Sequence, residues 1–192
     1  MRRALVAVLV VLAAAGCGRP APIVDYGPSP APSSSPPVSG SDPVDVYAAA
    51  ISRYLTGSEN SFSGTTFPVV FVLDRLDPAA ASPQAANEAT TPLSAEQQQR
   101  IATRVGGDVR FVSSLDAATT PGEDSCKVVR ENGVFIALGP AKATGADTGS
   151  DTAEVAVHGF VACLGATWFT YVLRRDPAGW TVTGTTGPMA IS

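Results

Sequence analysis

A long stretch rich in proline and serine limits where this chain can fold. Residues 18–42 are mostly Pro, Ser, Gly and Ala, and residues 28–37 contain only Pro, Ser and Ala. Such a segment buries too little apolar surface to offset the entropy lost on ordering, and its prolines favour an extended polyproline II conformation. We therefore expect a disordered stalk before residue 43 and a single folded domain over residues 43–192.

The residues before the stalk have the organisation of a bacterial export signal. Arg2 and Arg3 are followed by an apolar run over residues 4–15, which is too short for a membrane-spanning helix of roughly 20 residues. Small residues then lead directly to Cys17, and ordinary secretion leaves a free thiol at this position unexplained.

The segment ending at Cys17 resembles a bacterial lipobox, with Ala14 where a leucine is usual. The resemblance implies that residues 1–16 are a lipoprotein signal peptide, and that residues 17–42 are a cysteine acylated with fatty acids such as palmitate, followed by the stalk. Two acyl chains hold a protein stably on one leaflet, so we expect attachment to the extracytoplasmic face of the cell membrane. Ordinary secretion and a twin-arginine signal are the alternatives.

The charge balance argues against one class of partner. The chain has 13 basic and 17 acidic residues, and removing Arg2 and Arg3 with the signal leaves 11 basic residues against 17 acidic ones, a net charge of about −6. A nucleic-acid-binding surface needs an excess of basic residues. We therefore predict no nucleic-acid partner.

The remaining cysteines indicate a disulfide. Without Cys17, the chain has two cysteines, Cys126 and Cys163, and an oxidising compartment is expected to join them. Closing a loop of about 38 residues stabilises a fold by roughly 4 kcal/mol on the chain-entropy model. The alternative is a redox-active or metal-binding pair, but the chain has no Cys-x-x-Cys spacing and only one histidine.

Two helices are indicated by their end signals. Asp42 suits an N-cap and Pro43 suits a first helical position, and the apolar spacing that follows predicts a helix with one buried face that ends at Gly57. Ser94 and Gln97 form a capping box that begins a second helix, which ends at the next Gly-Gly pair. Its apolar stripe is thin, so we expect it to lie on the surface.

Strands account for most of the other residues. Residues 67–73 are β-branched and aromatic up to Asp74, a composition typical of a buried strand in the centre of a sheet. A short strand is expected over residues 109–112. Asn132-Gly133 predicts a type I′ hairpin between residues 126–130 and 134–138.

A second hairpin is expected to join residues 153–163 to residues 167–175 about Gly165, with a turn at 176–179 leading into a last strand from Trp180. If this hairpin closes at Gly165-Ala166, both of its faces are apolar. One face then carries Phe160, Phe169, Tyr171 and Leu173, and the other carries Val155, Val157, Val161, Trp168 and Val172. Each face is therefore either covered or lines a cavity.

These elements predict an α+β domain in which an N-terminal helix and one inserted helix pack on a curved antiparallel sheet. The arrangement resembles the cone-shaped NTF2-like and cystatin-like folds, in which helix and sheet enclose a pocket. The strands at residues 170–175, 180–188 and 190–192 are also similar to the ends of uncharacterised actinobacterial lipoproteins. That resemblance implies a compartment and a source but no activity, and a shared fold does not define function.

The residues that could carry chemistry form no coherent catalytic set. His158 is the only histidine, and the chain has no Gly-x-Ser-x-Gly sequence to present a nucleophile. Asp147-Thr148-Gly149 has the letters of an aspartic-protease loop, but there is no second copy and the surroundings indicate a turn. We predict no catalytic residue, no metal site and no cofactor, with a hydrolase using His158 or the carboxylates Asp74 and Asp77 as the alternative.

A recognition patch is the remaining candidate site. Tyr171, Arg174, Arg175 and Trp180 lie close together in the sequence, and arginine and aromatic residues are enriched at binding hot spots. The alternative is an arginine pair beside a hairpin turn. We expect a lipid-anchored, non-enzymatic binding or accessory module of the cell envelope, with an unknown small ligand or envelope protein as its partner. An envelope hydrolase and a structural protein-interaction domain are the alternative functions.

Overall fold

The fold is described from a computed structural model of the chain, over residues 43–60, 62, 64–84, 89–144 and 151–192. The predicted signal peptide, Cys17, the stalk with Asp42, and Asp147-Thr148-Gly149 lie outside the described residues. The helices are α1 (Pro43–Thr56), α2 (Ala95–Val105) and α3 (Leu115–Ala118), with short 3₁₀ helices η1 (Pro78–Ala81), η2 (Glu123–Ser125) and η3 (Arg130–Asn132). The strands are β1 (Val70–Leu76), β2 (Thr91–Pro92), β3 (Val109–Val112), β4 (Thr119–Pro121), β5 (Lys127–Val129), β6 (Val134–Leu138), β7 (Lys142–Ala143), β8 (Thr152–Phe160), β9 (Ala166–Asp176) and β10 (Gly179–Ile191).

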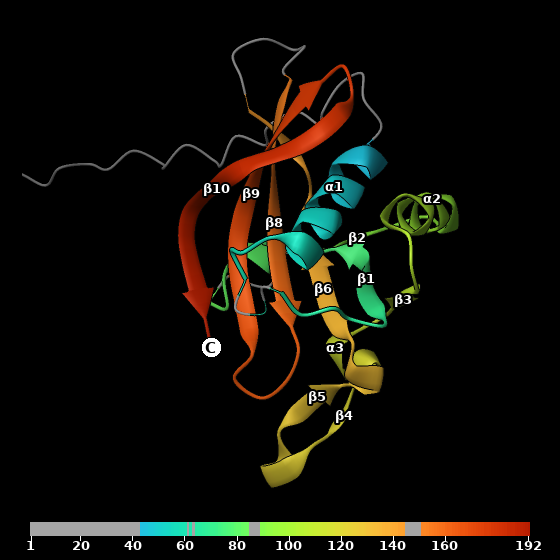
Figure 1. The fold of residues 1–192 in the computed structure, drawn as a ribbon, viewed down its shortest axis with the longest axis vertical. Helices are drawn as coiled ribbons and strands as arrows, with labels where there is room; N and C mark the ends of the chain where they lie inside the picture. The colour runs from blue at the N-terminus through green and yellow to red at the C-terminus, as the bar shows by residue number, and fades with distance from the viewer. Residues whose placement is uncertain (1–42, 61, 63, 85–88, 145–150) are drawn as a thin grey trace, which may run out of the picture. The chain divides into compact units, whose positions relative to one another are not determined.

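Eight of these strands form one curved, open sheet, as expected for an α+β domain (Figure 1). The strand order is β10-β9-β8-β6-β1-β2, with β3 beside β1 and β7 beside β8. The strands from β6 to β10 pair antiparallel, as predicted. β1, however, pairs in parallel with both β3 and β6, because long connections, one containing α2, return the chain in the same direction.

The helix α1 covers one face of this sheet, which we call the inner face (Figure 1). Tyr54 of α1 stacks on Phe169 of β9 with ring centroids 6.0 Å apart, and its hydroxyl forms a 2.9 Å hydrogen bond with the buried Thr167. Gly159 makes this approach possible, since a Cβ there would lie 1.9 Å from the Tyr54 hydroxyl oxygen. Burial raises the pKa of Tyr54 to about 12, which keeps the hydroxyl protonated.

The interface between α1 and the sheet is filled by side chains. Ile51, Tyr54, Val155 and Tyr171 have no accessible surface, whereas a void large enough for water would leave some on the residues around it. The pocket expected between helix and sheet is therefore not present at these residues. Burying such side chains stabilises a fold by about 1.5–3 kcal/mol each, so this interface is a main source of stability.

A second apolar cluster lies on the other face, which we call the outer face. It is centred on Phe71, Phe135 and Phe160, and α3 and β5 cover it. The sheet thus has a covered face on the inner side and a partly covered face on the outer side. Among the described residues, α3 and β5 cover this end of the outer face, and η1 packs over β8 and β9 further along it.

Both predicted helices are confirmed. α1 begins at Pro43 and buries one face, which includes Val44, Tyr47, Ile51 and Tyr54. In α2 the side chain of Ser94 accepts a hydrogen bond from the backbone of Gln97, and the Gln97 side chain accepts one from the backbone of Ser94. Ile101 is the buried residue of α2, in agreement with its expected surface position.

The hairpin predicted at Asn132-Gly133 is wrong. A tight turn does occur, with positive φ at Glu131 and Asn132, but the strands on its two sides do not pair. β5 pairs with β4 in a separate two-stranded sheet, and β6 enters the main sheet between β1 and β8. Every residue of β6 is buried, so its burial in the main sheet outweighs the local preference for a hairpin. The strand predicted over residues 67–73 is β1, which continues past Asp74 to Leu76.

The hairpin of β8 and β9 is confirmed, but its predicted register is wrong. The first pair is Phe160 with Ala166, so the connection is the five-residue loop 161–165. A shift by an odd number of residues exchanges the faces of one strand relative to the other. Val155 and Val157 therefore lie on the inner face with Phe169, Tyr171 and Leu173.

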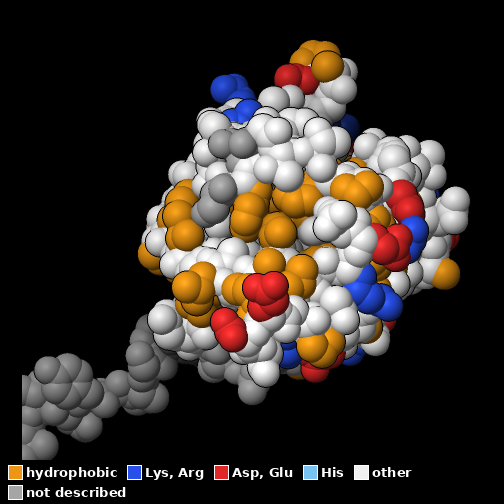
Figure 2. Space-filling view, turned by 60° about the horizontal axis from the view of Figure 1, so that its bottom comes forward, with side chains coloured by type: hydrophobic (Ala, Val, Ile, Leu, Met, Phe, Trp, Pro, Cys, Tyr) orange, Lys and Arg blue, Asp and Glu red, His pale blue; other side chains and the backbone are white. Residues whose placement is uncertain are grey.

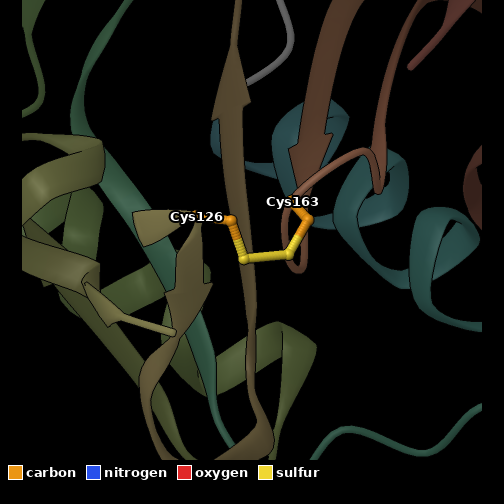
Figure 3. Close-up of a disulfide and its surroundings, with 2 residues drawn as sticks. All are labelled: Cys126 and Cys163. Atoms are coloured by element: carbon orange, nitrogen blue, oxygen red, sulfur yellow. A yellow bond between two sulfur atoms is a disulfide. The ribbon is translucent and has the colours of Figure 1, made fainter. Parts of the chain in front are cut away.

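The predicted disulfide joins Cys126, next to β5, to Cys163 in the loop between β8 and β9 (Figure 3). Their Cα atoms are 5.0 Å apart. The bond ties the small β4–β5 sheet, which extends from the lower end of the domain in Figure 1, to the main sheet. Within the described residues, no helix has the length and apolar composition needed to cross a membrane.

Candidate ligand-binding site

The outer face of β8 and β9 changes from polar to apolar along the strands. Alternate residues of each strand point to this face, and the register sets them opposite one another. From the β9–β10 turn toward the disulfide, the pairs are Thr152 with Arg174, Glu154 with Val172, Ala156 with Thr170, His158 with Trp168, and Phe160 with Ala166. The last two pairs belong to the outer cluster, which α3 and β5 cover. The three pairs nearer the β9–β10 turn lie outside that cluster, and we call them the upper part of this face.

A cavity of about 210 Å³ lies over this upper part. Its walls come from segments that are far apart in the sequence: η1, the end of β6, and β7, β8 and β9. Pro78, Ala81, Pro140 and Ala156 supply apolar surface, and Thr170 supplies a hydroxyl. The cavity therefore combines a mostly apolar wall with a few polar groups, as small-molecule sites generally do.

Backbone and capping contacts hold the walls in place. The Asp77 side chain accepts a 2.9 Å hydrogen bond from the Ala79 backbone and so caps η1, while the Asp77 backbone donates to Leu138 at 2.7 Å. Gly139 donates to the backbone of Ala156 at 2.9 Å, and a Cβ at Gly139 would lie 2.8 Å from the Ala156 Cβ. Glycine is thus required where β6 ends against β8.

Two opposite charges face each other at the cavity. Lys142 of β7 is the register partner of Glu154 of β8, and both line the cavity. Within the described part of the chain, neither side chain forms a hydrogen bond or an ion pair. Sequence reasoning missed both residues. The alternation along β8 could have indicated Glu154, since it shares a face with Ala156 and His158.

His158 lies one step further along the outer face and serves the packing. Its ring stacks on Trp168 with centroids 4.7 Å apart and meets the edge of Phe135 at 6.0 Å. Burial lowers the pKa of His158 to about 4, and the nearby charge of Asp77 opposes this shift. The ring is therefore neutral near pH 7, and its buried Nε2 has no hydrogen-bond partner among the described residues.

The carboxylates considered for hydrolysis have structural partners. Asp77 caps η1, and Asp74 forms a 2.7 Å ion pair with Arg75. No group of three His, Cys, Asp or Glu side chains suited to a metal ion occurs within the described ranges. The structure thus brings Asp77 near His158 but gives each a role in the fold.

The four residues of the predicted recognition patch do not form one surface. Tyr171 is fully buried on the inner face, and burial raises the pKa of its hydroxyl. Arg174 is exposed on the outer face, whereas Arg175 is opposite Trp180 on the inner side of β9 and β10. Trp180 is 9% exposed and lines an open depression between α1 and the β9–β10 turn, beside the ion pair of Asp45 and Arg104.

Exposed apolar groups occur elsewhere on the surface. Leu164, Met189 and Ile191 are the large hydrophobic side chains exposed in the described part of the chain. Figure 2 shows hydrophobic side chains reaching the surface in the middle of the face it presents, with acidic and basic side chains around them. Nothing in the structure indicates what would cover them, so the cavity beside Lys142 and Glu154 is the better candidate site.

No protein-family model matches this chain, and no significant similarity to a curated protein or to a solved structure is found.

Proposed function

We propose that this chain is a lipid-anchored domain on the extracytoplasmic face of the cell membrane, where it binds a small molecule and catalyses no reaction. The sequence supports the anchor through Cys17 and the apolar run before it. The disulfide supports an oxidising compartment, because disulfides persist in such compartments and are rare in the cytosol.

The cavity on the outer face is the observation that carries the binding role. It offers apolar walls and two charges, Lys142 and Glu154, that form no ion pair with each other or with any other residue described in the structure. The residues considered for catalysis instead serve the fold, since His158 is stacked and neutral and Asp77 caps η1. Binding therefore accounts for the arrangement better than a hydrolase does.

We also propose that the domain is a distant variant of the NTF2-like or cystatin-like architecture. The packing of α1 across a curved sheet supports this relation. Two features distinguish the domain from a simple cone: β1 pairs in parallel with β3 and β6, and the space under α1 is filled. The ligand is therefore proposed to bind on the opposite face of the sheet.

Native mass spectrometry of the full chain, purified from the membranes of its host, tests the binding role. We expect a small molecule to be retained by the wild type and lost in Thr170→Phe, which fills the cavity. Thr185→Phe is the matched control, because Thr185 is an exposed threonine of β10 away from the cavity. A molecule retained equally by both variants, or by neither variant nor the wild type, contradicts the proposal and favours a structural protein-interaction domain.

Two further measurements test the anchor and the absence of catalysis. Mass spectrometry of the mature N-terminus is expected to find acylated Cys17. A screen against envelope substrates is expected to show no turnover that depends on His158, Asp74 or Asp77. Loss of a measured activity on substituting any one of these three would support the hydrolase instead.

A further inference from the structure

The pairing of β7 with β8 sets a lysine and a glutamate side by side without joining them. Residues directly opposite on antiparallel strands have Cβ atoms about 4.5–5.5 Å apart, close enough for opposite charges to attract. Lys142 and Glu154 are such partners, yet no ion pair connects them or joins either to another described residue. Both side chains line the same cavity instead. The pair is therefore available to a ligand that carries both charges.

We propose that this cavity binds a small zwitterion, such as a free amino acid with an uncharged side chain. Its carboxylate contacts Lys142 and its ammonium group contacts Glu154. A simple anion would gain the lysine but face the repulsion of the glutamate, and a simple cation would meet the reverse problem. A zwitterion satisfies both charges at once, which gives selectivity as well as attachment. This inference rests on the proposed binding function and assigns its ligand class.

The walls and the size of the cavity suit the rest of such a molecule. Pro78, Ala81, Pro140 and Ala156 offer apolar surface for an aliphatic side chain, next to the two charges. A volume of about 210 Å³ corresponds to about seven waters at about 30 Å³ each, which is comparable to an amino acid such as valine with about eight non-hydrogen atoms. A disaccharide or a nucleotide is too large to be enclosed there.

Calorimetric titration of the full chain in detergent with valine, N-acetylvaline and valinamide tests the ligand class. N-acetylation removes the ammonium charge, and amidation removes the carboxylate. A hydrogen bond to a charged group contributes enough that each removal is expected to weaken binding about tenfold or more. Derivatives that bind as tightly as valine overturn the inference.

Matched variants then assign the contacts. Lys142→Gln is expected to weaken valine binding about tenfold but not valinamide binding, since it removes a repulsion from that cation. Glu154→Gln is expected to weaken valine binding about tenfold but not N-acetylvaline binding, since it removes a repulsion from that anion. Arg175→Gln is the control, because it removes an exposed cation on the other side of β9. The thermal midpoint of each variant is measured alongside, so that a loss of folding is not mistaken for a loss of contact. Lys142→Gln or Glu154→Gln with unchanged valine affinity overturns the assignment.

The same titrations separate this inference from the proposed function. If valine does not bind but the wild type retains another small molecule that Thr170→Phe expels, the ligand class is wrong and the binding function stands. If valine does not bind and no molecule is retained, both the ligand class and the binding function are wrong.

Discussion

The burial of His158 makes the stability of this fold depend on pH. Packing against Trp168 and Phe135 lowers the pKa of His158 to about 4, compared with an ordinary value of 6.5. The folded chain therefore binds this proton less tightly than the unfolded chain. The contribution of neutral His158 to the free energy of unfolding is therefore fully present above about pH 6.5, and it is lost progressively as the pH falls toward about 4.

The size of this effect follows from the shift. Each pKa unit corresponds to about 1.4 kcal/mol, so at about pH 4.5 the unfolded state gains about 2.5 kcal/mol relative to the folded state through His158 alone. That is a large part of the total stability of a typical domain, which is about 5–15 kcal/mol. The effect is therefore measurable by ordinary denaturant unfolding.

Urea unfolding of the wild type and of His158→Phe at about pH 7.5 and about pH 4.5 measures the effect. The chain has one histidine, so the variant removes this titration completely, and phenylalanine keeps a ring beside Trp168. The two proteins carry the same acidic residues, so contributions other than that of His158 cancel in the comparison. We expect the wild type to lose about 2.5 kcal/mol more than the variant on acidification. Equal losses would refute the argument that His158 is held neutral by burial.

Three further substitutions probe other parts of the fold by the same unfolding assay. Replacing Cys126 and Cys163 together by serine is expected to lower stability by about 4 kcal/mol, because the unfolded chain regains the freedom of a long loop; a loss below about 1 kcal/mol would argue against this. Ser94→Ala removes the capping contact of α2 and should cost about 1 kcal/mol, and an unchanged midpoint would show the cap to be dispensable. Gly159→Ala places a Cβ against the buried hydroxyl of Tyr54 and should lower the free energy of unfolding by about 1–3 kcal/mol. Gly184→Ala is the control, because its Cβ would lie in open space, and it should lower stability less. Similar losses of stability in the two variants would contradict the packing argument.

The elements with local signals could be predicted from the sequence. The start of α2 depends on two side chains three residues apart, and α1 depends on an apolar spacing and on Pro43, so both helices are recognisable without knowledge of the rest of the fold. The disulfide was also predictable, since a chain with two remaining cysteines allows one pairing.

The non-local pairings could not be predicted in the same way. The turn at Glu131 and Asn132 has the backbone conformation of a hairpin turn, but the strands beside it find partners elsewhere. The fully apolar β6 belongs in a position with neighbours on both sides, which β1 and β8 provide. Which strand takes that position depends on the whole sheet and not on the residues near the turn.

The candidate site could not be predicted either, because it also depends on non-local strand pairing. The sequence indicated Asp77 as a candidate carboxylate for hydrolysis. In the structure it caps η1, which forms one wall of the cavity. Lys142 and Glu154 carry no motif, and their relation depends on the register of β7 with β8. A site assembled from separate segments leaves little local trace in the sequence.

The register of β8 with β9 decides which side of the sheet can hold a ligand. A shift of one residue would turn Glu154 and Ala156 toward the face that carries Tyr171, where α1 would bury the carboxylate at a high energetic cost. In the observed register, Val155 and Val157 complete the core under α1, and Glu154 is left on the outer face beside the cavity. The register begins at the loop 161–165, which the disulfide ties to the small β4–β5 sheet. The filled core and the open cavity are therefore two consequences of one loop length, and a change in that loop is expected to damage both together.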